Sequence, residues 1–128
     1  MKPPVETVRT SRQGRDQLIK LKKYTGAAHW NELCRWALCA SLAEPNVPPL
    51  HTQKLEGGVE MSWRVFAGDQ QDLFRSLIIL RASKDGFPSD SEGIGECFRA
   101  HLHRGLNFLS SGLDTRSVAS FFARWVGD

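Results

Sequence analysis

Hydrophobic residues recur along most of this chain with the spacing of an α-helix, and the clearest example lies in its first third. The apolar positions there follow the i, i+3, i+4, i+7, i+8, i+12 stripe of a core-facing helix. They are Trp30, Leu33, Cys34, Ala37, Leu38 and Leu42. Because Pro45, Pro48 and Pro49 follow closely, the pattern predicts that the helix ends near Leu42 and opens a polar loop over residues 43–58.

The segment before this helix combines a helical pattern with a high density of positive charge. Residues Arg12–Tyr24 are predicted to form a helix that buries Leu18 and Leu21. Ser11 is suited to the N-cap position, because its hydroxyl can accept a hydrogen bond from a backbone N–H of the first turn. Gly26 is suited to the left-handed conformation that ends many helices.

Two short stretches have the character of β-strands. Val5–Thr10 is β-prone and precedes the basic helix, whereas residues 1–7 are expected to be flexible. Val59–Ala67 alternates apolar and polar positions, which predicts a half-buried strand. The apolar face of that strand consists of Val59, Met61, Trp63, Val65 and Ala67.

Three more helices are predicted after this second strand, with a Gly/Pro/Ser/Asp-rich loop over residues 85–95 between the first two. The first helix begins with Asp69 as its cap and has Leu73, Phe74, Leu77 and Ile78 as its apolar face. The next has an apolar side that runs from Ile94 to Leu109. The last follows Gly112 and carries the stripe Val118, Phe121, Phe122 and Trp125. We expect that stripe to pack within the monomer, with packing against another subunit as the alternative.

Together these elements predict one domain over residues 1–128 that is mainly α, or α+β with little β. The strand–helix–helix order at its start is that of ribbon-helix-helix DNA-binding proteins, which pair their strands across a dimer. Val5 and Val8 fall on opposite faces of the first strand, so the strand lacks a clean row of polar residues for reading bases. Contact with the DNA backbone is therefore expected rather than base-specific readout.

Composition is that of an ordinary globular protein, but the charge is unevenly distributed. A chain of 128 residues with 41% hydrophobic residues can bury a core without disulfides or metal. No apolar run is long enough for a membrane span, and the polar N-terminus does not resemble a secretion signal. Residues 1–40 carry eight Lys and Arg against three acids, whereas the remainder is net negative. This segregation favours a partner rich in phosphate.

The three cysteines are odd in number and form no close C-x-x-C pair. They are Cys34, Cys39 and Cys97. This pattern is typical of free thiols in a reducing compartment, and we expect a cytoplasmic protein.

Six cations lie within the fifteen residues Arg9–Lys23, and they form the main candidate binding site. They are Arg9, Arg12, Arg15, Lys20, Lys22 and Lys23. Long cationic side chains contact phosphates without a rigid pocket, and the release of condensed counterions drives the binding. The alternative is a solvated helix face. The density of the cluster and the net negative charge elsewhere favour binding to a polyanion.

Candidate catalytic or metal-binding groups are sparse. The chain has no Gly-rich phosphate loop. Cys97 and His101 lie four apart on one predicted helix, near His103, but a structural zinc site needs four ligands and a Cys–His pair needs an orienting carboxylate. We therefore expect a core cysteine, a partly exposed His101, and neither a metal nor a cofactor.

Glu60, Asp69 and Asp72 could surround a divalent ion, as a metal-dependent nuclease requires. For Asp69 and Asp72 the start of a helix is the favoured interpretation, because the Asp-x-x-Asp spacing directly precedes an apolar run.

Four segments give the chain a resemblance to the DndE family of DNA sulfur modification (DNA phosphorothioation) proteins. They are VRTSRQGRDQLIKLKKYTG, NELCRWALCASLAEP at 31–45, GGVEMSWRVFAGD at 57–69 and FRAHLHRGLNFL at 98–109. The resemblance runs from Val8 to about Gly112, and the LCR-ALC-SL pattern after a Thr-Gly helix stop is its most specific part.

The resemblance implies an accessory role in replacing a non-bridging phosphate oxygen of DNA by sulfur, alongside other subunits of the modification complex. It implies a homo-oligomer, with a tetramer favoured and a dimer possible, and a preference for nicked duplex DNA through surface lysines. On this chain the lysine role falls on Lys20, Lys22 and Lys23, and we add Arg9, Arg12 and Arg15 from charge alone. Two alternatives remain open: a nickase that prepares the strand, and a scaffold that assembles the complex.

Overall fold

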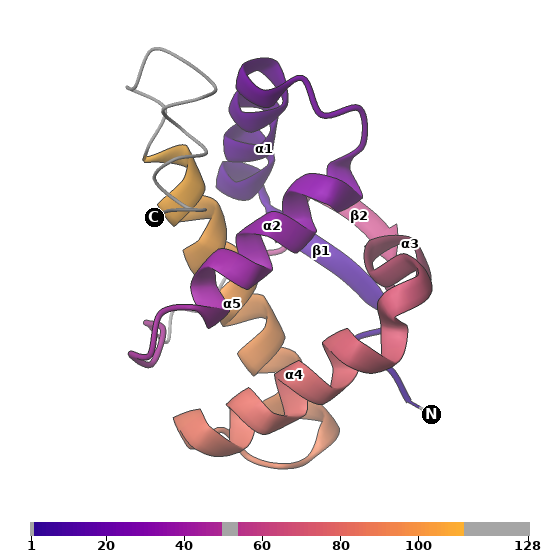
Figure 1. Ribbon diagram of the computed structural model, residues 1–128, viewed down its shortest axis with the longest axis vertical. Helices are drawn as coiled ribbons and strands as arrows, with labels where there is room; N and C mark the ends of the chain where they lie inside the picture. Colours follow the sequence, from indigo (N-terminus) through magenta and orange to yellow (C-terminus); the bar gives the residue numbers. More distant parts are fainter. Residues whose placement is uncertain (1, 50–53, 112–128) are drawn as a thin grey trace.

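The computed structural model describes residues 2–49 and 54–111, which form a mainly helical domain with a small sheet. Its elements are β1 (Thr7–Ser11), α1 (Arg12–Thr25), α2 (Trp30–Leu42), β2 (Gly57–Ser62), α3 (Trp63–Ala67), the 3-10 turn η1 (Gly68–Gln70), α4 (Gln71–Asp85) and α5 (Ser91–Ser110). The long helix α5 runs through the middle of the molecule, α2 crosses it, and α1 and α4 lie toward opposite ends (Figure 1). This arrangement confirms the predicted fold class of mainly α with little β. Among the described residues, no helix is long and apolar enough to cross a membrane.

The first two helices form where the sequence predicts them, because their ends are capped as expected. The Ser11 hydroxyl accepts a hydrogen bond from the Gly14 N–H at 3.0 Å, which closes the first turn of α1. Gly26 ends α1 in the left-handed conformation, with its N–H donating to the Lys22 carbonyl. Helix α2 spans the predicted stripe and buries Leu33, Cys34, Ala37 and Leu38.

The two strands pair with each other within the chain. They are antiparallel, with Thr7 opposite Ser62 and Arg9 opposite Glu60, and the register shifts between Arg9 and Ser11. The pairing of strands across a dimer, which characterises ribbon-helix-helix proteins, is therefore not how β1 finds its partner here.

The prediction of a strand over Val59–Ala67 is wrong in its second half. β2 ends at Ser62, whose hydroxyl caps the short helix α3 by accepting from the Val65 N–H at 3.1 Å. Within the same residues, Trp63, Phe66 and Ala67 also have helical spacing, and all three are buried. Burial of these three side chains favours the helix over the alternating strand pattern.

Three other expectations differ from the structure. Asp69 lies in η1 and the N-cap of α4 is Gln70, so Asp69 is not the cap. The loop expected over 85–95 is confined to residues 86–90, because Asp90 caps α5 through the Gly93 N–H. On α4 only Phe74 and Ile78 of the predicted apolar face are buried. The last predicted helix, with Phe121, Phe122 and Trp125, lies outside the described residues.

The core is centred on an aromatic cluster where α3, α4 and α5 meet. The ring of Phe66 lies 5.3 Å from Trp63, 5.5 Å from Phe74 and 5.3 Å from Phe98, measured between centroids. These tilted and edge-to-face contacts are the preferred geometry of aromatic pairs. The most extensive packing in the domain joins α2 to α5, so α5 supports both the α2 side and the α1 side of the molecule.

Candidate nucleic-acid interface

Helix α1 presents most of the predicted DNA-binding cations, and its orientation is fixed by burial of its opposite face. Gly14, Leu18 and Leu21 are its buried residues, and α1 packs against α5. The strand β1 that leads into α1 is paired with β2, so the start of the helix is also held in place. The cationic side of α1 therefore has a defined orientation, facing away from the core.

Four of the six predicted cations are exposed on α1: Arg12, Arg15, Lys20 and Lys23. At roughly 100° per residue, Arg12, Arg15 and Lys23 follow one flank of the helix and Lys20 lies further round. Within the described part of the chain, none of the four forms an ion pair. Their charge is thus directed to solvent, where a phosphate could approach.

The two remaining cations, Arg9 and Lys22, contact other side chains of the domain. Arg9 on β1 forms an ion pair with Glu60 on β2 at 3.1 Å, and both side chains are more than half exposed. The Lys22 ammonium lies 4.7 Å from the centroid of the Trp30 ring, a cation–π contact that ties α1 to the start of α2. We expect Arg9 and Lys22 to contribute less to phosphate binding than the freely exposed cations, because a phosphate must compete with these partners.

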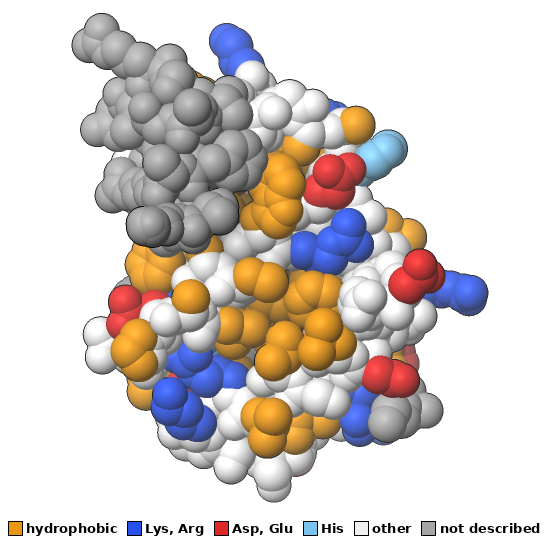
Figure 2. Space-filling view, viewed as in Figure 1, with side chains coloured by type: hydrophobic (Ala, Val, Ile, Leu, Met, Phe, Trp, Pro, Cys, Tyr) orange, Lys and Arg blue, Asp and Glu red, His pale blue; other side chains and the backbone are white. Residues whose placement is uncertain are grey.

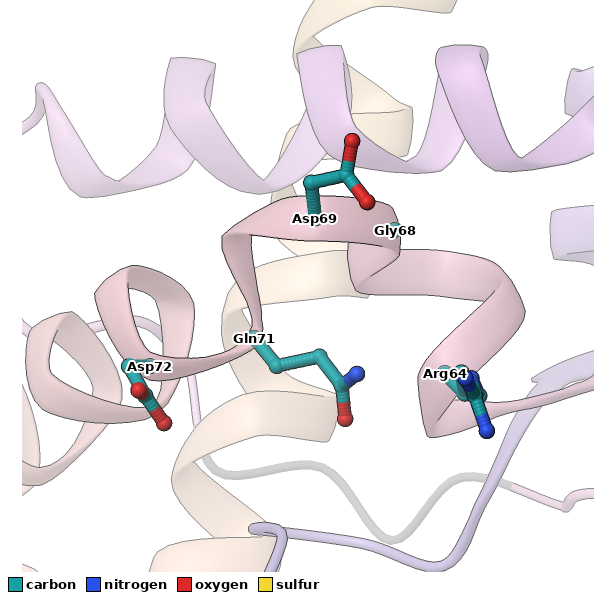
Figure 3. A pocket seen from close by; sticks show the side chains of 5 residues that line it. All are labelled: Arg64, Gly68, Asp69, Gln71 and Asp72. Carbon is teal, nitrogen blue, oxygen red and sulfur yellow. The ribbon is translucent and has the colours of Figure 1, made fainter.

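The carboxylates that could have formed a divalent-ion site do not converge. Arg64, Gly68, Asp69, Gln71 and Asp72 line an open hollow of about 600 Å³ (Figure 3). Asp69 and Asp72 point in different directions there, and Glu60 is instead paired with Arg9. The hollow therefore lacks the convergent set of oxygen ligands that a metal-dependent nuclease needs.

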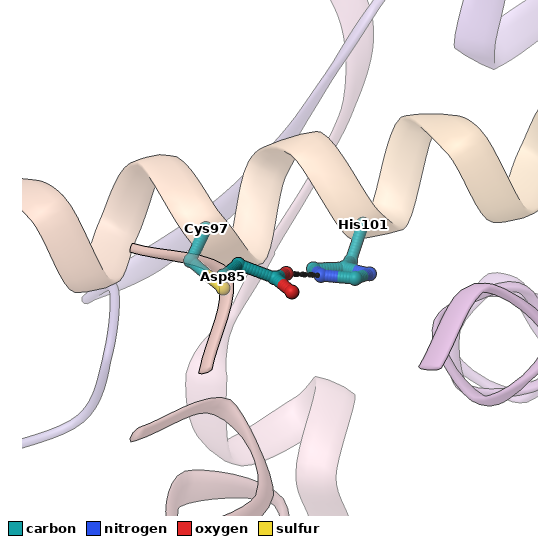
Figure 4. Close-up of side chains that lie close together, drawn as sticks. All are labelled: Asp85, Cys97 and His101. Atoms are coloured by element: carbon teal, nitrogen blue, oxygen red, sulfur yellow. Dashed lines mark hydrogen bonds and ion pairs between the residues drawn. The ribbon is translucent and has the colours of Figure 1, made fainter. Parts of the chain in front are cut away.

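A buried polar network links α2, α4 and α5. His101 and Asp85 bond at 2.8 Å between Nε2 and Oδ2 (Figure 4), and the Ser41 hydroxyl lies 2.8 Å from the other ring nitrogen, Nδ1. Arg81 donates to Asp85 at 2.9 Å, and Arg104 donates to the Ser41 hydroxyl at 2.8 Å. His101 and Ser41 are fully buried, and only 1% of the Asp85 side chain is exposed. The expectation of a partly exposed His101 is wrong, and so is the expectation that no carboxylate orients it.

The two arginines of this network also hold the chain that leaves α2. Arg81 donates to the carbonyls of Leu42, Glu44 and Asn46, and Arg104 to those of Ser41, Glu44 and Asn46. Sequence reasoning missed both residues. The local signal for Arg81 was its i, i+4 spacing to Asp85, whereas the oxygens of Ser41, Glu44 and Asn46 that accept from Arg104 lie about sixty positions away.

The protonation states in this network follow from burial. Burial lowers the pKa of His101, and the bond to Asp85 opposes this only in part. Burial would raise the pKa of Asp85, but its bonds to Arg81 and His101 hold that pKa below its usual value. A neutral His101 then donates from Nε2 to Asp85 and accepts the Ser41 hydroxyl proton at Nδ1.

Ser41, His101 and Asp85 have the order of a catalytic triad, but their burial and hydrogen bonds leave no nucleophile that a substrate could reach. The Ser41 hydroxyl is shielded from solvent and already accepts from Arg104. Burial raises the pKa of the nearby Cys97 thiol to about 12. Asp85, Cys97 and His101 could offer ligand atoms within 4.8 Å of one another, but Arg81 already occupies the carboxylate and the thiol resists ionisation. The residues fit a structural network better than a metal site or a nucleophile.

His103 is a second buried histidine, and it forms hydrogen bonds at the N-terminal end of α1. Its Nε2 accepts a hydrogen bond from the backbone N–H of Ser11 at 3.1 Å, while Nδ1 donates to the Arg99 carbonyl at 2.8 Å. Both bonds require the neutral ring with its proton on Nδ1. Burial lowers the pKa of His103 accordingly. The N-cap of the cationic helix is thus fixed by a side chain from α5.

The fold and its surface define a small helical protein whose exposed helix α1 carries a cluster of free cations beside a sheet of two strands. The model of the family described as DNA sulphur modification protein DndE matches residues 7–117, so the chain belongs to the DndE family. It is similar in structure to DndE from Escherichia coli B7A, which is described as involved in DNA phosphorothioation modification. That comparison has a TM-score of 0.69 at 22% identity, and covers 82% of this chain and 96% of the other. No curated protein gives a significant match.

Proposed function

We propose that this protein is a non-catalytic accessory subunit of a DNA phosphorothioation system that binds the phosphates of duplex DNA. In this proposal it prefers nicked duplex, has no sequence preference of its own, and acts as a homo-oligomer, with a tetramer favoured. It works beside the other subunits of the modification complex, in the cytoplasm and associated with the nucleoid. Family membership supports the system, and the surface of α1 supports the contact with DNA.

The observation that carries the proposal is the exposed set Arg12, Arg15, Lys20 and Lys23 on a helix with two capped ends. A phosphate that binds such cations displaces condensed counterions, so the binding constant depends steeply on salt. If one α1 surface neutralises four phosphates, log K falls with log salt at a slope of about −3.6.

The test is a titration of intact and singly nicked duplexes of one sequence, followed by fluorescence anisotropy across a range of salt. The variant K20A/K22A/K23A should weaken binding to both duplexes and flatten the salt dependence. The matched control, K2A/K54A/R64A, removes three exposed charges from outside α1 and should bind like the parent. Equal binding by parent and K20A/K22A/K23A, or the absence of salt dependence, would refute the electrostatic site.

The nickase alternative finds weaker support in the described residues, because His101 and His103 are buried and hydrogen-bonded. It is tested by incubating supercoiled plasmid with the protein and magnesium. Open circles that form with the parent and are lost with D69A/D72A would establish nicking and overturn the non-catalytic assignment.

A further inference from the structure

Helix α4 carries an apolar stripe whose side chains are exposed among the described residues. Leu73 is 51% exposed, Leu77 36% and Leu80 68%, whereas Phe74 and Ile78 on the inner side of the helix are buried. The three leucines follow a 4, 3 spacing, which places them on one side of the helix. This is the spacing of the seam through which two helices pack in a coiled coil.

The apolar surface extends beyond these leucines. Leu42 from the end of α2 lines a shallow hollow of about 210 Å³ together with Leu77 and Leu80. Trp36 of α2 is 38% exposed. Figure 2 shows hydrophobic side chains gathered in the centre of this face, in the region of α2 and α4. A contiguous patch of this kind on a small domain indicates an interaction surface.

The charges at the two ends of the leucine stripe on α4 are complementary to those of a second copy of α4. Asp72 is exposed in the first turn of α4, Asp69 is exposed in η1 just before that helix, and Lys84 is exposed in its last turn. When two copies of α4 lie antiparallel with Leu73 of one opposite Leu80 of the other, residue 69 falls opposite residue 84. Each end then joins acids of one copy to a lysine of the other, and the two helix dipoles also oppose.

We infer that α4 is a self-association surface, through which two copies of this chain pair antiparallel about a two-fold axis near Ser76 and Leu77. The contact is isologous, because one surface that carries both members of each charge pair is complementary to itself. Leucines fill its centre and Asp69, Asp72 and Lys84 set its register. This inference deepens the proposed homo-oligomer, of which α4 would supply one interface. It does not depend on DNA binding.

Oligomer mass in the absence of DNA tests the surface. Light scattering coupled to size exclusion should show an assembly for the parent and half its mass for L80D. Because Leu80 is 68% exposed, L80D should keep the parent's circular dichroism and melting behaviour. The control I19D places the same charge at another exposed apolar position, on α1, and should keep the parent's mass. A monomeric parent, or an L80D variant with the parent's mass, would overturn the inference.

Cysteine cross-linking tests the position of the axis. In a C39S background, which removes the exposed native thiol, L77C should form a disulfide-linked dimer on mild oxidation. K84C should not, because the two copies of residue 84 lie at opposite ends of the paired helices. Cross-linking of K84C but not L77C would exclude the antiparallel register.

Charge reversal separates a second copy of this chain from any other partner. K84E should weaken association, since it faces Asp69 and Asp72 of the other copy, and D69K/D72K should weaken it for the same reason. The combined variant D69K/D72K/K84E restores opposite charges within a self-pair and should recover the parent's mass. Failure to recover would show that these charges do not face each other. None of these residues belongs to the α1 cation cluster, so loss of DNA binding by the lysine variant and loss of assembly here are separate outcomes.

Discussion

His101 and His103 are held neutral because each of their ring nitrogens already has a committed partner. His101 lies between Ser41 and Asp85, and His103 between the Ser11 N–H and the Arg99 carbonyl. Protonation would place a second N–H against a donor, and at His101 it would add a cation beside Arg81 and Arg104. The two histidines are therefore the residues through which acid should destabilise the fold.

We predict that the free energy of unfolding falls as the pH drops below about 6.5, the ordinary pKa of histidine. Burial lowers both histidine pKa values in the folded protein, so the unfolded chain takes up protons first. The slope should approach about 1.4 kcal/mol per pH unit for each histidine. Urea unfolding at a series of pH values measures it. A stability that rises on acidification through this range would contradict the assignment of neutral rings.

The variant H103Q removes one of these two groups and should reduce the slope by about half, whatever its effect on stability at pH 7. NMR titration of the imidazole protons in the folded protein gives an independent reading, because the remaining buried ring should titrate below pH 6.5. An unchanged slope in H103Q would mean that His103 titrates alike in the folded and unfolded chains.

For single residues, the sequence predicted interactions between neighbours in the chain and missed hydrogen bonds between residues far apart in it. Ser11 and Gly26 were recognisable as caps, because a cap depends on residues within four positions. The network around His101 was not, because Ser41, Asp85 and Arg104 come from three elements that only the fold brings together. The same holds for the Ser11–His103 bond, which spans 92 positions.

Among the elements, α2 and α5 approach so closely that a glycine is required between them. A Cβ added at Gly105 would overlap the backbone carbonyl of Ala37, and backbone cannot move aside as a side chain can. Gly105 lies within the helix that the sequence predicts over Ile94–Leu109, but the sequence gives no reason for a glycine there, since Ala37 lies 68 positions away. Gly93 is comparable, because a Cβ there would overlap the Pro88 carbonyl.

We predict that G105A destabilises the domain by about 3 kcal/mol or more, at or above the upper end of the usual cost of overpacking. An isolated helix would gain from the same substitution, because alanine has the higher helix propensity. Thermal and urea unfolding measure the difference. The control E96A changes an exposed position on the same helix and should stay close to the parent. A stabilised G105A would show that α2 and α5 are further apart than the structure places them.

The N-cap of α1 offers a second test at the level of elements. S11A removes the acceptor of the Gly14 N–H and should cost about 0.5–2 kcal/mol of stability, the usual range for a serine cap. The control S83A changes an exposed serine within α4 and should have little effect. Equal stability of the two variants would mean that the cap bond contributes nothing measurable.

Helices α1 and α2 were predictable because their patterns are unambiguous, and α3 was not. Residues 59–65 satisfy the period of two, but Phe66 breaks it, and Trp63, Phe66 and Ala67 satisfy a helical spacing. Whether these residues form a strand or a helix depends on the contacts of Trp63 and Phe66 with Phe98 and Phe74, and these partners lie outside the segment. The basic cluster was recognisable from its charge density, and its role in binding DNA stays a prediction, whereas the contacts of Arg9 with Glu60 and of Lys22 with Trp30 required the fold.

In the whole molecule, the cationic helix and the apolar stripe occupy opposite ends. Figure 1 places α1 and α4 on either side of α5 and α2. Pairing through α4 would therefore leave both copies of α1 exposed and separated in space. Such an assembly could bind one long duplex through two α1 surfaces, or a short duplex through one.

We predict that L80D weakens binding to a long duplex but not to a short one. On a short duplex only one α1 surface can bind, so the parent and L80D should have equal affinity and a salt slope of about −3.6. On a long duplex the parent should bind more tightly, because the second contact is intramolecular, and the slope should approach about −7. Anisotropy titrations with duplexes of graded length measure both quantities.

The α1 cations and the α4 stripe should affect different quantities, namely DNA affinity and oligomer mass, so the two sets of variants serve as controls for each other. K20A/K22A/K23A should lose affinity on every duplex length while keeping the parent's mass, whereas L80D should lose mass and only the length-dependent part of the affinity. If L80D binds long duplexes as tightly and as steeply as the parent, the two α1 surfaces do not share one duplex. If the lysine variant instead changes the mass, α1 belongs to an assembly interface and its cations cannot be assigned to DNA alone.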